Sequence, residues 1–182
     1  MEAVRIGYAD PPYPGCAHLY VDHPDYAGEV DHGDLLSRLD RDYDGWIYHT
    51  NSTTLPQTII LCHDLAITGY RIMSWVKPFA AFKRNVSVAY AWEPVLVKAA
   101  RKPIVTQEVV MRDWIAESIT MRKGLTGAKP PKVCEWLFHV VGAEPGDELD
   151  DLYPGTGIVG ETWDAWSGRD TRVGDGQIGL FG

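Results

Sequence analysis

Segments typical of β-strands alternate with segments typical of helices along most of this sequence. Leucines recur at helical spacing in DHGDLLSRLDRDY, and TTLPQTIILCHDLA places a proline in what would be a first helical turn. The other helix-like segments are AKPPKVCEWLFHVVGA and IVGETWDAWSG, and the strand-like segments are RIGYA, GWIYHTNS, YRIMSWVKP, VAYAWEPVLVKAA and DELDDLY. Because strands joined through helices pack as parallel neighbours, this alternation predicts an α/β layered domain with a largely parallel sheet.

Two stretches fit this pattern less well. Pro94 interrupts one strand-like segment, which favours an edge position or a bulge for that strand. Residues 101–127 show the least periodicity and are rich in basic residues. With 182 residues, of which 45% are apolar, the chain is expected to form a single domain over residues 1–182.

The composition narrows the class of protein further. No stretch approaches the roughly 18 apolar residues of a membrane span, and MEAVRIGYAD lacks the features of a signal peptide, so we expect a cytoplasmic protein. The cysteines Cys16, Cys62 and Cys134 are odd in number and widely spaced, which favours buried, reduced thiols.

Charge is distributed unevenly along the chain. Residues 1–70 hold three Lys or Arg against eleven Asp or Glu, residues 71–132 hold twelve against four, and residues 133–182 hold two against ten. A basic middle within an acidic protein is what a face that binds phosphates requires, although chance clustering of solvated side chains remains an alternative. The candidate phosphate contacts are Lys83, Arg84, Arg101, Lys102, Arg122 and Lys123.

Two strand ends carry unusual turns. Ligands of open α/β sheets bind outside the carboxyl ends of the strands, where this chain has Asp10-Pro11-Pro12-Tyr13 and Tyr153-Pro154-Gly155-Thr156-Gly157. At the first, an amino-bearing planar base could donate its two N–H protons to Asp10 and to the Pro11 carbonyl while it stacks on Tyr13. At the second, a helix N-terminus would meet a carboxylate or phosphate. A purely structural turn remains the alternative at both.

Other tempting residues have plainer interpretations. The spacing of His18, His23 and His32 fits no common metal site, so we expect surface-loop histidines and predict no metal. The tryptophans of the strand-like segments, Trp46, Trp75 and Trp92, are expected in the core rather than as plates on which bases stack.

The motifs together resemble the amino-methyltransferases of DNA, which methylate exocyclic amines of adenine or cytosine with S-adenosylmethionine (SAM). DPPY resembles the catalytic motif of that family, DLYPGTG its D-x-F-x-G-x-G cofactor motif, and TGAKP the Lys-Pro motif before a helix. The order, with the catalytic motif first, is the circularly permuted order of the β-type branch. The match covers roughly residues 4–168 and is greatest to short methylase-like proteins of phages and actinobacteria.

The resemblance implies a Rossmann-like methyltransferase three-layer sandwich, circularly permuted and shortened at the C-terminus. It also implies a single methyltransferase-like domain over residues 1–182, without a separate target-recognition domain. It implies that Asp10, Pro11 and Tyr13 hold a flipped-out base, with Pro12 shaping the turn. It further implies a SAM pocket, in which the residues around the methionine end of the cofactor are Asp151, Tyr153, Gly155 and Gly157, closed by Lys129 and Pro130.

The implied activity is SAM-dependent methylation of DNA at the N6 amine of adenine, with cytosine second. DNA is the expected partner, and a homodimer or a partner subunit is expected to complete the cofactor pocket or to supply specificity. Two alternatives stay open: a non-catalytic nucleic-acid-binding protein on the same scaffold, and an enzyme of this fold that adds another group to a DNA base.

Overall fold

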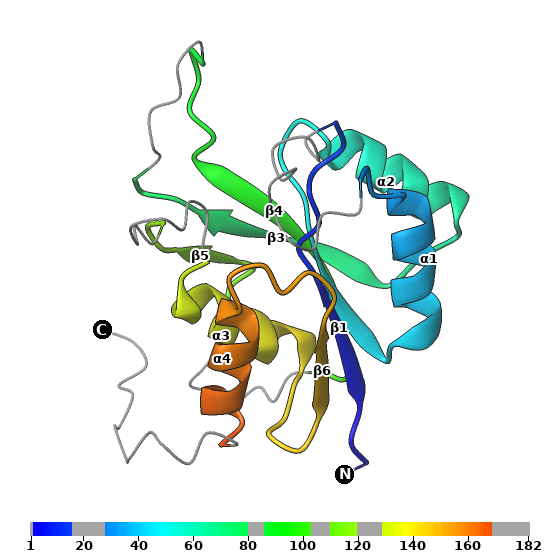
Figure 1. The fold of residues 1–182 in the computed structure, drawn as a ribbon, viewed down its shortest axis with the longest axis vertical. Coiled ribbons are helices and arrows are strands. Elements are labelled where there is room, and N and C mark those ends of the chain that lie inside the picture. Colours follow the sequence, from blue (N-terminus) through cyan, green and yellow to red (C-terminus); the bar gives the residue numbers. More distant parts are fainter. Residues whose placement is uncertain (1, 16–27, 80–85, 103–109, 120–128, 169–182) are drawn as a thin grey trace.

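The protein is described by a computed structural model that covers residues 2–15, 28–79, 86–102, 110–119 and 129–168. Its centre is a six-stranded sheet in the order β5-β3-β4-β2-β1-β6 (Figure 1). The strands are β1 (Arg5–Ala9), β2 (Gly45–His49), β3 (Tyr70–Val76), β4 (Trp92–Lys98), β5 (Trp114–Ala116) and β6 (Glu148–Asp151). The helices are α1 (His32–Asp42), α2 (Leu55–Asp64), α3 (Pro131–Val141) and α4 (Ile158–Trp166).

The direction of the strands confirms the predicted, largely parallel sheet. β1 pairs in parallel with β2 on one side and with β6 on the other, and β3 pairs in parallel with β5. β4 lies between β2 and β3 and is antiparallel to both. The carboxyl ends of β1, β2 and β6 therefore lie at one edge of the sheet, together with the first residues of β4. We call this the site edge.

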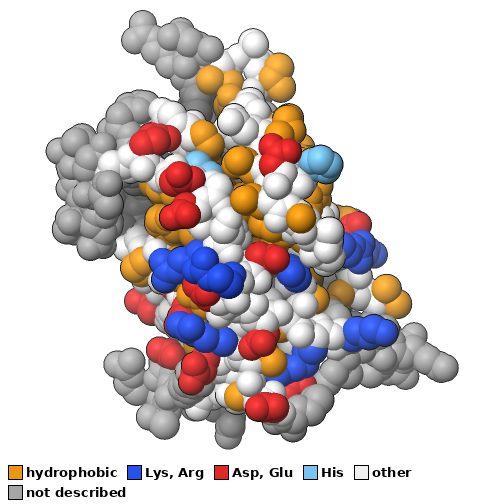
Figure 2. All heavy atoms as spheres, turned by 90° about the vertical axis from the view of Figure 1, so that its right-hand side faces the viewer, with side chains coloured by type: hydrophobic (Ala, Val, Ile, Leu, Met, Phe, Trp, Pro, Cys, Tyr) orange, Lys and Arg blue, Asp and Glu red, His pale blue; other side chains and the backbone are white. Residues whose placement is uncertain are grey.

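Apolar side chains cover both faces of the sheet and form two cores. On one face, α3 and α4 pack Leu137, Phe138 and Trp163 against strand residues such as Tyr8 and Ile47. On the other face, α1 and α2 supply a second core whose members include Leu35, Leu36, Leu39, Cys62, Trp46 and Tyr48. Figure 2 looks onto the side of α1 and α2, where hydrophobic side chains gather in the upper half and Lys and Arg side chains in the lower half. The result is the expected three-layer α/β sandwich.

Helix ends follow the local sequence closely. Asp31 caps α1, because its side chain accepts a hydrogen bond from the Asp34 N–H at 2.9 Å. Gly142 ends α3 in the left-handed region at φ +79°, where a Cβ would lie 2.4 Å from the carbonyl oxygen of Arg101. Glycine is therefore required there by conformation and by space.

Two expectations need correction. β5 lies within residues 101–127, where the weak periodicity did not reveal a strand. Pro94 occupies a strand inside the sheet, and the continuous register from Tyr70–Lys98 to Val76–Trp92 leaves no bulge. The missing N–H of Pro94 is tolerated because the ladder between β2 and β4 ends at the pair His49–Val95, next to the proline.

Cys62 and Cys134 are buried free thiols, as predicted, while Cys16 lies outside the described residues. No helix within the described ranges is long and apolar enough to cross a membrane.

Candidate functional site

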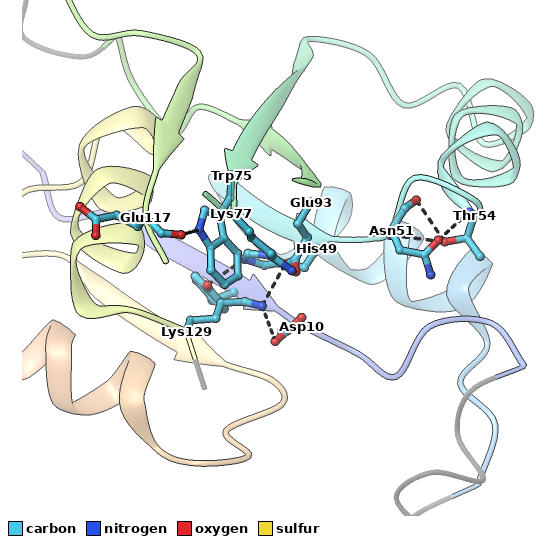
Figure 3. Close-up of polar contacts among 10 residues, drawn as sticks. Asp10, His49, Asn51, Thr54, Trp75, Lys77, Glu93, Glu117 and Lys129 are labelled. Carbon is cyan, nitrogen blue, oxygen red and sulfur yellow. Dashed lines mark hydrogen bonds and ion pairs between the residues drawn. The ribbon is translucent and has the colours of Figure 1, made fainter. Parts of the chain in front are cut away.

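Asp10 directly follows β1 at its carboxyl end, and its side chain faces the buried Lys129. The Nζ atom of Lys129, two residues before α3, lies 2.8 Å from Oδ2 of Asp10 (Figure 3). The side chain of Asp10 is 31% exposed, whereas that of Lys129 is 5% exposed. The carboxylate of Asp10 is thus held on one side and remains accessible at the site edge.

Lys129 also contacts a second carboxylate that the sequence did not point to. Its Nζ lies 3.0 Å from Oε1 of Glu93, the second residue of β4, and that oxygen lies 2.8 Å from Nδ1 of His49. The other oxygen of Glu93 accepts from Nζ of Lys77 at 2.8 Å. The Tyr8 hydroxyl completes the chain at 2.8 Å from Nε2 of His49.

These contacts determine which groups are charged. Burial opposes charge on Lys129, but the carboxylates of Asp10 and Glu93 together outweigh it and raise the pKa of its ammonium group. Burial likewise opposes charge on Glu93, yet Lys129, His49 and Lys77 hold the pKa of its carboxyl well below the usual range. Burial lowers the pKa of His49, and Lys129 lowers it further, so the imidazole is neutral at pH 7. The ammonium groups of Lys77 and Lys129 therefore both contact Glu93, and Lys129 also contacts Asp10.

Donor atoms of Asp10, His49 and Glu93 lie within 4.8 Å of one another, an arrangement that could hold a metal ion. The ammonium group of Lys129 already contacts both carboxylates, so a metal ion would have to displace it. That the function requires no metal ion stays a prediction.

The second strand end lies directly beside the first. Asp151 is the last residue of β6, paired in register with Tyr8 of β1, and the Leu152 N–H donates to the Tyr8 carbonyl at 2.9 Å. One oxygen of Asp151 accepts from the Tyr153 N–H at 3.2 Å, while Oδ2 is buried without a hydrogen-bond partner in the described part of the chain. Burial raises the pKa of this carboxyl to about 6. Asp151 thus presents an unsatisfied acceptor at the site edge.

The turn after Asp151 exposes the start of α4. Gly155 and Gly157 have φ of +47° and +76°, and Gly157 precedes α4 without a side-chain cap. A Cβ at Gly157 would meet no atom within 4 Å, so open space lies in front of the turn. The free N–H groups of the first turn of α4 are available to an anionic group.

The structure places the predicted residues as follows. Pro11 is buried, Pro12 and Tyr13 are half-buried beside Asp10, Tyr153 is half-buried in the glycine turn, and Pro130 immediately precedes α3. Lys129 forms an ion pair with Asp10, and its place in a cofactor pocket stays a prediction.

Two of the predicted phosphate contacts lie away from the site edge. Arg101 and Lys102 follow the carboxyl end of β4, which is antiparallel to β2, and so lie at the opposite edge of the sheet. Arg101 also pairs with Asp147 at 2.6 Å. Lys83, Arg84, Arg122 and Lys123 lie outside the described residues, as do His18 and His23.

Two aromatic predictions are wrong. His32 is not a surface-loop residue: it begins α1, is buried, and lies with Nδ1 2.6 Å from the Tyr48 hydroxyl. Trp46 and Trp75 are in the core as expected, but Trp92 is 40% exposed. Among the described residues, Trp92 and Trp114 belong to neither of the two cores.

His49, Glu93 and Lys77 were missed from the sequence. His49 is the last residue of β2 and Lys77 directly follows β3, so the rule for strand ends could have found both. Glu93 reaches the site because β4 runs antiparallel, and nothing in the sequence pattern indicated that reversal.

Comparison with known proteins adds evidence on the fold. No protein-family model and no curated protein matches the sequence. Among solved structures, the fold is similar to that of M1.HpyAVI in complex with SAM, with a TM-score of 0.59, 17% identity, and coverage of 91% of this chain and 79% of that one. A second structure of M1.HpyAVI gives a TM-score of 0.54, 12% identity, and coverage of 92% and 77%. The chain therefore has the Rossmann-like α/β fold of methyltransferases.

Proposed function

We propose that this protein is a SAM-dependent DNA methyltransferase that methylates the exocyclic amine of adenine, with cytosine second, and has the permuted motif order of the β-type amino-methyltransferases. The observation that carries the proposal is the pairing of two strand ends on a methyltransferase fold. Asp10, held by Lys129, lies at one end, and Asp151 with the bare glycine turn lies at the neighbouring end. M1.HpyAVI, the DNA methyltransferase of similar fold, was solved with SAM, which supports the choice of cofactor.

In this proposal Asp10 and the Pro11 carbonyl hold the target amine. Oδ2 of Asp10 faces Lys129, so Oδ1 is the oxygen that accepts an N–H of the amine, and the ring of Tyr13 lies against the base. The ion pair with Lys129 fixes the orientation of the Asp10 carboxylate. The nitrogen must lose a proton once it carries the methyl group, and the carboxylate of Asp10 is placed to accept it.

The turn at β6 fits the methionine end of SAM. The partnerless Oδ2 of Asp151 suits an ammonium group, and the free N–H groups of α4 suit a carboxylate. Bound SAM would supply a methyl group already activated on a sulfonium. The residues around Asp10 then contribute mainly position and electrostatics.

DNA contacts are proposed for the exposed tryptophans at the first residues of β4 and β5. Trp92 and Trp114 are 40% and 42% exposed, and the guanidinium of Arg112 lies 5.3 Å from the ring centroid of Trp114. All three residues belong to the basic segment 71–132. Exposed indole rings beside a cation can stack on unpaired bases, and extrusion of the target base exposes such bases.

One observation favours a second candidate function. In the described part of the chain, β6 is an edge strand whose only neighbour is β1. No further strand end therefore lies beyond β6 to bind the adenosine half of SAM. Of the acidic residues that could bind its ribose, Asp164 lies in α4, and Asp170 and Asp175 lie outside the described residues. A DNA-binding protein on a methyltransferase scaffold, without SAM affinity, would be consistent with this edge.

Nucleoside analysis by mass spectrometry tests the proposal. Unmethylated DNA incubated with the protein and SAM should yield N6-methyladenine. Detection of N4-methylcytosine instead would make cytosine the preferred target base. A different mass on the amine would support transfer of another group. Calorimetric titration separates the second candidate: DNA binding without measurable affinity for SAM would favour the non-catalytic protein.

A further inference from the structure

A pocket lies beside the catalytic-motif loop, on the side of α1 and α2. Its volume is about 240 Å³, and its walls include Pro14 from the loop, Asp31 and His32 at the start of α1, and Gln57 and Leu61 of α2. Pro14 directly follows Tyr13. The pocket is therefore separate from the ion-pair network around Lys129 but adjoins the motif proposed to hold the target base.

His32 is one of the residues that line this pocket, and its side chain has an unsatisfied polar atom. The residue is 8% exposed, and its Nε2 is buried without a hydrogen-bond partner among the described residues. Nδ1 is occupied by the Tyr48 hydroxyl at 2.6 Å. Burial lowers the pKa of His32, so the neutral ring offers Nε2 either as a donor or as an acceptor. A buried polar atom of this kind is normally satisfied, which points to a ligand.

The other walls favour a flat heterocycle with polar edges. The carboxylate of Asp31 can accept hydrogen bonds, the amide of Gln57 can donate and accept them, and Pro14 and Leu61 supply apolar surface. No Lys or Arg belongs to the residues that line the pocket in the described part of the chain, so a phosphate group is disfavoured. The volume lies below the roughly 300–1,000 Å³ of pockets for drug-sized ligands, which suits a single base.

We propose that this pocket is a subsite for the base next to the target base, and that it gives the protein a preference for that neighbour. The inference rests on the proposed function for the position of the target base. With that base against Tyr13, the adjoining nucleotide of the same strand passes Pro14, where the pocket opens. Hydrogen bonds from His32 and Gln57 to the edge of this base would supply part of the sequence preference that a recognition domain otherwise supplies.

The test uses a pool of DNA in which the positions around one unpaired adenine are randomised. Bound and free molecules are sequenced, and the same pool is then sequenced for methylation. The wild-type protein should enrich one base at one flanking position on the order of fivefold or more. Gln57→Trp, which fills the pocket from the exposed surface of α2, should reduce the enrichment to below about twofold. Ile60→Trp, on the same helix but outside the pocket, should leave it unchanged.

A second variant addresses the histidine itself. His32→Asn should reduce the same enrichment, and a thermal unfolding curve shows whether the variant is folded. If the binding preference is the same in wild type and Gln57→Trp, or if the wild type has none, the subsite is wrong. If methylation is absent but the binding preference depends on Gln57, the proposed activity fails and the subsite stands.

Discussion

At the scale of single residues, Lys129 has the most consequential contacts in the molecule. It is buried and lies within 3.0 Å of both Asp10 and Glu93, so it connects the catalytic motif to the interior network. Removing one member of such a buried group leaves uncompensated charge, which costs far more than the net stabilisation by an intact pair. Lys129 is therefore important for stability as well as for the orientation of Asp10.

Lys129→Met tests this role. The variant leaves the buried carboxylate of Glu93 with one ammonium group fewer, and we expect a loss of about 3–5 kcal/mol in the free energy of unfolding at pH 7.5. Urea denaturation measures it. Lys132→Met is the matched control, because Lys132 lies in the first turn of α3 with its side chain 75% exposed. This substitution should change the free energy of unfolding little. A loss below about 1 kcal/mol for Lys129→Met would contradict the account.

Asp151 predicts a pH dependence of cofactor binding. Burial raises its pKa to about 6, above the unfolded value, so the folded state favours the protonated carboxyl. The stability that this preference contributes is present at low pH and is lost as the pH rises through 6. Conversely, the ionised form that attracts an ammonium group predominates above about pH 6.

SAM affinity should therefore weaken as the pH falls from 7.5 to 5, with a midpoint near 6. Asp151→Asn should bind SAM more weakly at pH 7.5 and show a flatter pH profile. Calorimetric titration at several pH values measures both. An identical pH profile in the two proteins would remove Asp151 from the cofactor site.

At the scale of elements, most helices and strands were predictable from local patterns. α1 begins at an acidic cap and has leucines at helical spacing, and α3 ends at Gly142, as the sequence indicated. β5 was not predictable because three residues carry too little periodicity. The inner position of Pro94 depends on where the neighbouring ladder ends, which is a tertiary property.

The end of α3 offers a test of backbone requirements. Gly142→Ala forces a side chain into φ +79° and brings a Cβ to 2.4 Å from the Arg101 carbonyl oxygen, so we expect at least about 2 kcal/mol of destabilisation. Gly146→Ala, four residues later, meets no atom within 4 Å and should be nearly neutral. Thermal or urea unfolding compares the two, and equal stability would mean that the turn is not built as described.

The proposed DNA contact of the exposed tryptophans can be tested by substitution. Trp114→Ala should weaken binding of single-stranded DNA by about fivefold or more, because stacking on one base is worth about 1–3 kcal/mol. Ile60→Ala on α2, also exposed, should leave binding unchanged. Fluorescence anisotropy with a labelled oligonucleotide gives both affinities. Equal affinities for the wild type and Trp114→Ala would exclude Trp114 from DNA binding.

At the scale of the whole molecule, the fold joins two segments that lie 140 residues apart in the chain. β1 and β6 pair in register, so Asp10 and Asp151 end neighbouring strands. The strand-end rule marked both segments in advance, and the motif resemblance linked them. The interior network was predictable only in part. His49 and Lys77 lie at the carboxyl ends of β2 and β3, but Glu93 joins them through the antiparallel course of β4.

The charge pattern was informative only in part. The basic middle of the chain contains β3, β4 and β5, but it also contains Arg101, which is engaged with Asp147 at the far edge of the sheet. Net charge along a sequence indicates which segment can bind a polyanion. It does not indicate which of its cations are already paired within the fold.

The central claim is that the site edge at Asp10 transfers a methyl group to a base amine. It is tested most directly by incubating DNA with SAM labelled in the methyl group and comparing wild type, Asp10→Ala and the exposed control Asp64→Ala. We predict label transfer by the wild type and by Asp64→Ala, and a loss on the order of a hundredfold or more in Asp10→Ala. No transfer by the wild type, or equal transfer by Asp10→Ala, would contradict it.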